Sequence, residues 1–205
     1  MNESFYINLH KGLVIPVVVT LMWWYGNGTL EMWIYLALHG TYSILWLLKQ
    51  AWYPDKRFAV PRPAWIGVFF VFVPLASYYV APFLLASRPV ALPVPVIAGA
   101  ISLYTFGTFF HYVGDAQKFF TLRARPGLIA DGLYARTRNP NYFGEILIYS
   151  AFATLAAHWL AFAIVAGWAA FFFLPGIIAK DRSLSRYPEY QAYKARTWPL
   201  IPRPW

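Results

Sequence analysis

The sequence contains no cysteine and few charged residues. The absence of cysteine excludes disulfides, thiolate nucleophiles and cysteine-based zinc sites, and it leaves the redox compartment open. Charged residues make up 12% of the 205 residues, whereas a typical soluble domain has about 25%. Hydrophobic residues make up 60% and aromatic residues 20%. This composition excludes an ordinary soluble domain and predicts an integral membrane protein.

The common nucleotide and metal motifs are also missing. Neither G-x-G-x-x-G nor G-x-x-x-x-G-K-S/T occurs, so any nucleotide must be held by side chains. The four histidines, His10, His39, His111 and His158, are widely spaced, and no H-E-x-x-H pattern is present. No metal site is therefore predicted. The chain also lacks a nucleic-acid recognition motif, and we expect no nucleic-acid partner.

Six apolar segments, separated by turn or charged residues, predict membrane-spanning helices. Several are shorter than the roughly 20 residues that a perpendicular span needs, and the first is the weakest. We expect a tilted or partly interfacial helix there, retained because no cleavable signal pattern precedes it. The segments are residues 12–25, 32–48, 64–85, 94–110, 141–157 and 160–178.

The arrangement of these segments gives a fold prediction. The last two are separated only by about His158 and Trp159, which predicts a tight helix hairpin. Prolines within or near the spans predict kinks. We therefore predict a single membrane domain over residues 1–205. It is an all-α integral membrane helical bundle of about six transmembrane helices, with a C-terminal helix hairpin and a cytosolic tail.

The net charge of +9 is unevenly placed along the chain. Basic residues gather in residues 49–62, in residues 111–139 and in the tail from Lys180, whereas the alternate connections hold only Arg88. By the positive-inside rule, this pattern places both termini in the cytoplasm, and we expect a bacterial inner membrane. Two explanations of the excess charge stay open. It marks topology and attracts anionic lipid headgroups, or it binds a phosphate-bearing cofactor.

Residues 132–145 form the densest polar cluster, at the start of an apolar segment. Because Pro140 disfavours helix at the residue before it, we expect the helix to begin near Asn141. Asn141 and Glu145 then share one helix face. Glu145 is the only carboxylate within residues 132–180, and a charge at the mouth of an apolar segment needs a partner. The cluster is a candidate site, and the alternative is a helix cap and interfacial anchor.

Several short motifs follow one another in the second half of the chain. They are Asp115-Ala-Gln-Lys118, Gly132-Leu-Tyr134, Arg138-Asn-Pro-Asn141-Tyr-Phe-Gly-Glu145, Lys180-Asp-Arg182, Tyr187-Pro-Glu-Tyr190 and Leu200-Ile-Pro202. In order and spacing they resemble the C-terminal half of the steroid 5-alpha-reductase superfamily, which includes bacterial steroid-reductase-like membrane proteins. The similarity covers about residues 111–205 and extends more distantly to the sterol C-14 reductases.

The resemblance implies an all-helical membrane enzyme that binds NADPH from the cytosol and reduces an activated carbon–carbon double bond in a lipid-like or steroid-like enone. Residues 1–110 would be the substrate-side helices and residues 111–205 the cofactor-binding half. The predicted cofactor-binding residues are Asp115, Lys118, Arg123, Arg138, Asn141, Tyr142, Glu145, Arg182 and Tyr190. We expect them to gather around one cytosol-facing cavity that prefers NADPH to NADH.

The predicted catalytic residues are His39, Tyr42 and Glu145. Hydride transfer needs an oriented cofactor and substrate, and a donor that polarises the carbonyl oxygen. The family carries a His-Tyr pair in a substrate-facing helix, whereas this chain reads His39-Gly40-Thr41-Tyr42. Gly40 stands where the resemblance leads us to expect the donor tyrosine. We expect Tyr42, two residues later, to take the place of that tyrosine. From the residues alone, a polar contact between helices is the alternative.

Two other functions stay open. A related membrane scaffold occurs in the isoprenylcysteine and phospholipid methyltransferases, which would bind S-adenosylmethionine. Their paired glutamates are missing, and Lys180-Asp181-Arg182 occupies that neighbourhood, which suits a phosphorylated cofactor better than a sulfonium cation. The third possibility is a non-enzymatic membrane scaffold or lipid-binding protein. The expected partners are a lipid-like small molecule and membrane lipids, and no oligomeric state is predicted.

Overall fold

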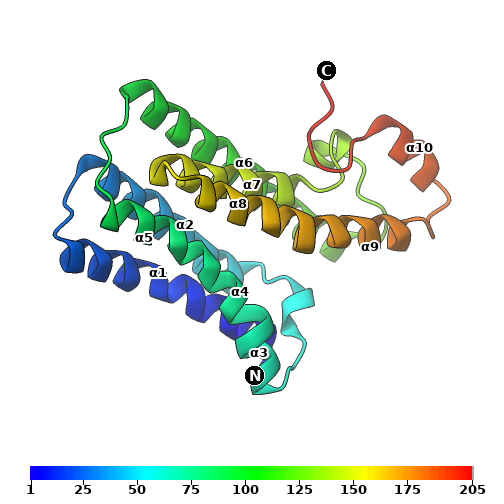
Figure 1. The fold of residues 1–205 in the computed structure, drawn as a ribbon. Coiled ribbons are helices and arrows are strands. Elements are labelled where there is room, and N and C mark those ends of the chain that lie inside the picture. The colour runs from blue at the N-terminus through cyan, green and yellow to red at the C-terminus, as the bar shows by residue number, and fades with distance from the viewer. Residues whose placement is uncertain (205) are drawn as a thin grey trace. The chain divides into compact units, whose positions relative to one another are not determined.

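The structure, a computed structural model, describes residues 1–204 and is mostly helical. Helices make up 78% of the chain, and no β-strand occurs in the described residues. The predicted all-α membrane fold is therefore confirmed (Figure 1). The α-helices are α1 (Glu3–Tyr25), α2 (Leu30–Trp52), α3 (Ala64–Gly67), α4 (Val73–Ala76), α5 (Val80–Ser87), α6 (Val94–Ala124), α7 (Pro140–Ala156), α8 (Trp159–Trp168), α9 (Leu174–Leu184) and α10 (Tyr190–Arg196).

Four helical segments are long and apolar enough to cross a membrane. They are Glu3–Tyr25, Ala64–Ser87, Val94–Ala124 and Trp159–Leu184. Each of the six predicted segments falls within helical structure, and the two that do not meet these criteria correspond to α2 and α7. Helix α7 has 17 residues, fewer than the roughly 20 of a perpendicular span.

Two helices extend far beyond the apolar segments that predicted them. Helix α1 begins at Glu3 rather than at residue 12, because the Asn2 side chain accepts a hydrogen bond from the Phe5 N–H at 3.1 Å and caps the helix. With 23 residues, α1 is long enough to span a bilayer. Helix α6 continues to Ala124 instead of ending near residue 110, because the next proline is Pro126.

Two prolines in the long helices, Pro74 and Pro175, follow a change in helical geometry. A π-helical turn at Val68–Phe72 precedes Pro74, and a second one at Ala169–Phe173 precedes Pro175. A proline has no N–H to donate to the carbonyl four residues before it, and its ring collides with that carbonyl. A wider turn relieves the collision while the helix continues, and this is the physical basis of the predicted kinks.

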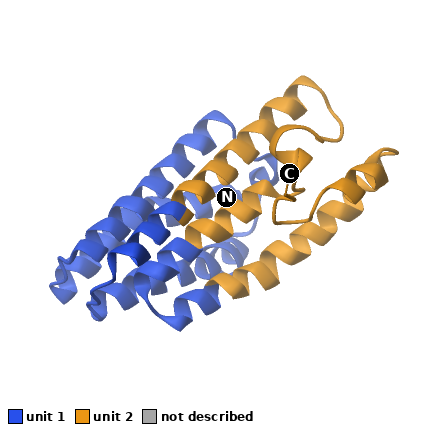
Figure 2. Cartoon of the chain, turned by 90° about the horizontal axis from the view of Figure 1, so that it is seen from above, with its two compact units in different colours: residues 1–102, 150–164 blue, residues 103–149, 165–205 orange. Residues whose placement is uncertain are grey.

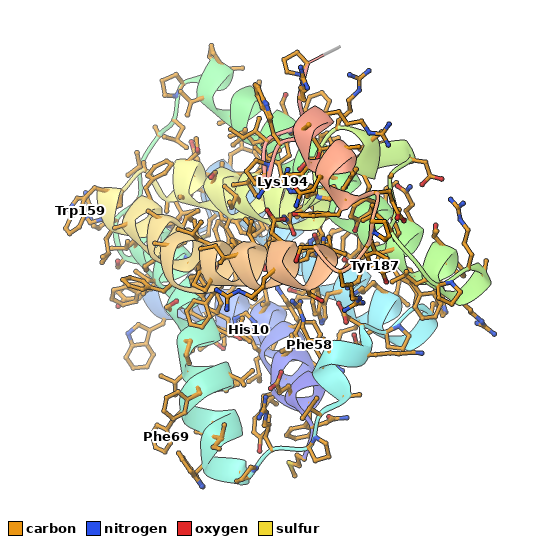
Figure 3. All side chains as sticks on the ribbon, turned by 90° about the vertical axis from the view of Figure 1, so that its right-hand side faces the viewer. His10, Phe58, Phe69, Trp159, Tyr187 and Lys194 are labelled. Atoms are coloured by element: carbon orange, nitrogen blue, oxygen red, sulfur yellow. The ribbon has the colours of Figure 1, made fainter. Side chains whose placement is uncertain are left out.

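The predicted tight connection between the last two apolar segments is confirmed. Helix α7 ends at Ala156 and α8 begins at Trp159. Ala157 adopts a positive φ of 48°, and its N–H donates to the Thr154 carbonyl at 3.1 Å, which reverses the chain in two residues. Trp159, labelled in Figure 3, is 73% exposed at this turn, and exposure is what an interfacial aromatic residue requires.

The chain forms two compact units (Figure 2). Unit 1 contains residues 1–102 and 150–164, and unit 2 contains residues 103–149 and the chain from Val165 onward. Helices α6, α7 and α8 each pass from one unit to the other. The predicted substrate-side residues 1–110 and cofactor-binding residues 111–205 are functional assignments, and they stay a prediction. The prediction of a single membrane domain stays a prediction.

In unit 1, α1 and α2 run antiparallel after a short connection at residues 26–29 (Figure 1). The indole N–H of Trp46 donates to the Asn8 side chain at 3.3 Å. The Lys11 ammonium lies 4.1 Å from the centroid of the Tyr42 ring. From the first contact to the second, the residue number rises in α1, from 8 to 11, and falls in α2, from 46 to 42. This order is that of an antiparallel helix pair.

In unit 2, α6 and α7 approach each other closely through glycines. A Cβ atom at Gly107 would lie 2.7 Å from the Gly144 carbonyl oxygen, and one at Gly144 would collide with the backbone of His111. The approach lets the His111 Nδ1 donate to the Asn141 carbonyl at 3.2 Å. Small residues allow this kind of backbone contact between membrane helices. The glycines therefore fix where the polar start of α7 lies against α6.

Replacing Gly144 by alanine should destabilise the protein by about 1–3 kcal/mol, because the new methyl group must push α6 and α7 apart. Gly99→Ala, also in α6, is the matched control because no atom lies within 4 Å of its Cβ position. That control should be neutral or stabilising by about 0.5–1 kcal/mol. Melting curves in detergent measure both. Equal melting temperatures for the two variants would contradict the close packing.

Candidate functional site

The polar motif before α7 holds the C-terminal tail of unit 2. The Thr137 hydroxyl donates to the Leu200 carbonyl at 2.7 Å, and the Asn139 side-chain amide donates to the Pro199 carbonyl at 2.7 Å. Between them, the Arg138 N–H donates to the Trp198 carbonyl at 2.9 Å. We call residues 137–139 and 197–200 together the tail clamp. Several of the polar groups that mark this motif in the sequence therefore bind the C-terminal tail.

Arg138 is the centre of the tail clamp and is 4% exposed. Its guanidinium makes a bidentate ion pair with Asp181 of α9, with Nε 2.9 Å from one carboxylate oxygen and Nη2 3.0 Å from the other. Its Nη1 donates to the Thr197 carbonyl at 2.7 Å. The planar fork of arginine matches a carboxylate in this way, so one side chain joins the motif, α9 and the tail.

Lys180 completes this polar network from α9. Its ammonium donates to the Arg138 carbonyl at 2.6 Å and to the Asn139 side-chain oxygen at 3.2 Å. It also lies 5.2 Å from the centroid of the Tyr134 ring. Two adjacent residues of α9, Lys180 and Asp181, thus contact the motif with opposite charges.

A cavity of about 130 Å³ opens beside the tail clamp in unit 2. Its walls come from α6, the loop that follows it, the motif, α9 and α10. The lining residues are Lys118, Leu122, Gly127, Leu128, Ile129, Tyr134, Arg138, Lys180, Leu184 and Tyr193. Side chains of three basic residues and two tyrosines thus contribute to a mostly apolar lining, and the charged ends of Arg138 and Lys180 at its edge already bind groups of the tail clamp and α9. A mostly apolar space with polar groups at its edge suits a partly apolar molecule that carries an anionic or hydrogen-bonding group.

Of the predicted cofactor-binding residues, Lys118 and Arg138 line this cavity. Asp115 is buried on α6, while Arg123 and Arg182 are exposed. Tyr190 is buried next to the Arg138–Asp181 pair, and burial, with a contribution from Asp181, raises its pKa to about 12. Tyr190 is therefore a neutral hydrogen-bonding group at physiological pH.

Asn141, Tyr142 and Glu145 lie on the first turns of α7, outside the lining of this cavity. The helix begins at Pro140, one residue from the predicted start, as a proline in the first turn favours. The Tyr142 ring stacks on Phe173 at 4.9 Å. Glu145 is half-buried, and among residues 1–204 no side chain or backbone group pairs with its carboxylate. The sequence led us to expect a partner for this carboxylate, and residues 1–204 do not supply one.

The two predicted catalytic residues of the first half, His39 and Tyr42, belong to unit 1 and are fully buried. The Tyr35 hydroxyl and the His39 Nδ1 are 3.0 Å apart, and the Phe152 ring stacks on His39 at 4.3 Å. Tyr42 lies beneath the ammonium of Lys11, which is itself 3% exposed. Both residues therefore sit in a buried polar and aromatic cluster, and their catalytic role stays a prediction.

Sequence reasoning missed Lys180, Tyr193 and Thr197 as members of the site. Lys180 appeared only within a motif, and Tyr193 lies one helical turn after the predicted Tyr190. That i, i+3 spacing on a short helix was the available signal for Tyr193. Thr197 had none, because its contact with Arg138 joins residues far apart in the sequence.

Within residues 1–204, no group of three or more histidine, aspartate or glutamate side chains could hold a metal ion. The fold defines an all-α integral membrane protein, and its unit 2 holds a small cavity beside the polar motif. The chain matches the family described as "Protein of unknown function (DUF1295)" over residues 12–197, and it belongs to that family. No curated protein matches the chain.

Proposed function

We propose that this protein is a membrane-embedded reductase that uses NADPH to reduce an activated carbon–carbon double bond in a lipid-like enone. NADPH would supply the hydride, and the side chains of the protein would hold and orient the cofactor and the acceptor. The observation that carries the proposal is the cavity of unit 2, where Lys118, Arg138 and Lys180 converge from three separate segments. These cations favour phosphate groups and disfavour a sulfonium cofactor.

The size of the cavity limits which part of the cofactor it would take. Its volume is about 130 Å³, whereas pockets that enclose a whole drug-sized ligand have roughly 300–1,000 Å³. A phosphate group fits this volume, and a complete dinucleotide does not. The remainder of NADPH would therefore lie outside the cavity, on other parts of the protein.

The first turns of α7 supply groups suited to the nicotinamide end of the cofactor. Asn141 lies one turn before Glu145, whose carboxylate is unpaired within residues 1–204. A carboxylate accepts hydrogen bonds from a carboxamide NH₂, and an asparagine amide both donates and accepts. We assign this pair to orientation of the nicotinamide amide. His39 and Tyr42 remain the predicted donors for the acceptor carbonyl.

The orientation in the membrane is part of the same proposal. The four apolar helices support a membrane protein, and the basic residues gather in alternate connections of the chain. By the positive-inside rule, both termini and the tail clamp would face the cytoplasm, and the membrane would be a bacterial inner membrane. NADPH would then reach unit 2 from the cytosol.

A cofactor screen by thermal shift on the purified protein tests the proposal. NADPH at about 100 times its dissociation constant should stabilise the protein by about 2.7 kcal/mol, because it binds only the folded state. NADH should bind at least about tenfold more weakly, since it lacks the additional phosphate. Lys118→Gln should weaken NADPH binding by about 1.5–3 kcal/mol, the value of a charge-assisted hydrogen bond.

The matched control for Lys118→Gln is Lys56→Gln, which removes an exposed lysine of unit 1 and should leave NADPH binding unchanged. Stabilisation by S-adenosylmethionine instead of NADPH would support the methyltransferase alternative. No response to any of the three cofactors would reject both enzyme proposals and leave the lipid-binding scaffold.

A further inference from the structure

The chain that follows the last membrane helix carries an unbalanced exposed charge. The apolar segment Trp159–Leu184 ends where this chain begins. The cations Arg186, Lys194 and Arg196 are exposed, and Glu189 is the exposed carboxylate among them. The neighbouring carboxylate, Asp181, is already bound by Arg138. Cations therefore dominate the solvent-facing side of this part of unit 2.

Helix α10 turns two of these cations, Lys194 and Arg196, outward. Tyr190 and Tyr193 are buried, one turn apart, and fix one face of the helix on unit 2. Lys194 and Arg196 belong to the remaining surface, and Figure 3 shows Lys194 on α10 and Tyr187 in the connection that leads to it. The inward face is held by tyrosine packing, so the cations are not needed to hold the helix.

The tail adds apolar groups that follow these cations in the sequence. Trp198 is 45% exposed and Ile201 is 56% exposed. The backbone of Trp198 is nevertheless fixed on both sides, because its N–H donates to the Arg136 carbonyl at 3.3 Å and its carbonyl accepts from the Arg138 N–H at 2.9 Å. The tail clamp thus holds the backbone of Trp198 in place while its indole stays about half exposed, and Ile201 follows directly after the clamp.

We propose that Arg186, Lys194, Arg196, Trp198 and Ile201 form a surface that binds the anionic lipid headgroups of the surrounding membrane. We call these five residues the C-terminal surface. Cations that directly follow a membrane helix are attracted to anionic headgroups, and tryptophan prefers the membrane interface. An acidic soluble protein would satisfy the cations equally well, but the adjacent membrane helix keeps the surface close to lipid. The C-terminal surface does not depend on the proposed reductase activity.

The absence of cysteine makes a direct test possible, because Ile201→Cys introduces a single labelling site in the whole chain. The purified full-length protein carries an environment-sensitive fluorophore at this position and is placed in lipid nanodiscs. One set contains phosphatidylcholine alone, and the other contains phosphatidylcholine with phosphatidylglycerol. We expect the label to report an apolar environment in the anionic nanodiscs and an aqueous one in the neutral nanodiscs.

Salt and charge removal test the electrostatic part. High salt should release the label from the anionic nanodiscs, because it screens exposed charges. The triple variant Arg186→Gln, Lys194→Gln, Arg196→Gln should lower the ratio of lipid-bound to lipid-free C-terminal surface about fivefold per charge, from about 1 kcal/mol for each basic residue. The control removes three exposed cations of unit 1, Lys56, Arg57 and Arg88, by the same substitution and should leave the ratio unchanged.

Three results would overturn the proposal. They are an identical label environment in neutral and anionic nanodiscs, an equal response of the triple variant and its control, and insensitivity to salt. The triple variant spares the buried tyrosines and the tail clamp, so its melting temperature should match that of the unmodified protein. A protein that binds no NADPH but shows this lipid dependence would reject the proposed reductase and keep the C-terminal surface.

Discussion

Replacing Arg138 by alanine is expected to lower the free energy of unfolding by about 3–5 kcal/mol. The arginine side chain is 5% exposed and its partner Asp181 19%, so the variant leaves a largely buried carboxylate without its counter-ion. It also removes the donor to the Thr197 carbonyl, which then lacks a hydrogen bond from this side chain. Equilibrium unfolding in mixed detergent micelles measures the change.

The chain contains a matched control for this loss. Arg125 and Asp131 form an ion pair with the same 2.9 Å separation, but their side chains are 68% and 60% exposed. Water screens that pair, so Arg125→Ala should cost no more than about 1 kcal/mol. In the Arg138 variant, the tail should also be cleaved by protease sooner. If Arg138→Ala and Arg125→Ala lowered the free energy of unfolding equally, the buried pair would not be what holds the tail.

Glu145→Gln is expected to lower the turnover of an enone panel and the affinity for NADPH while leaving the melting temperature nearly unchanged. The substitution keeps the shape of the side chain but removes the charge of a hydrogen-bond acceptor. If the carboxylate orients the nicotinamide amide, the loss is about 1.5–3 kcal/mol, or roughly 10–150-fold in kcat/KM. Stability should stay within about 0.5 kcal/mol, because no group of residues 1–204 pairs with this carboxylate.

Glu189→Gln is the control for Glu145→Gln. Glu189 is an exposed carboxylate of unit 2 at the N-cap position of α10. Its side chain makes no capping hydrogen bond to the helix. Its replacement should change neither turnover nor NADPH affinity. If Glu145 were only a helix anchor, Glu145→Gln would cost about 0.3–1 kcal/mol of stability through the helix dipole and leave the cofactor affinity unchanged. That combination would remove Glu145 from the site.

The polar motif at residues 132–145 shows where sequence reasoning succeeds and where it stops. The start of α7 at Pro140 is a local matter of proline geometry, and it was predicted to within one residue. Arg138 was predicted to face a cofactor, and it does line the cavity. Its guanidinium, however, is largely used by Asp181 and Thr197. A motif shows which groups are close along the chain, but it does not show which partners reach them from elsewhere.

The sequence by itself determined that this is an all-α membrane protein, which helices are apolar and where the last two are joined. These properties depend on local composition, on proline and on helix period, which act within a few residues. Only the tertiary structure decided the Arg138–Asp181 pair, the return of the tail to residues 137–139 and the cavity at Lys118, because those contacts join segments that lie tens of residues apart. Their formation follows from the path of the whole chain and the close approach of α6 and α7, which no local pattern encodes.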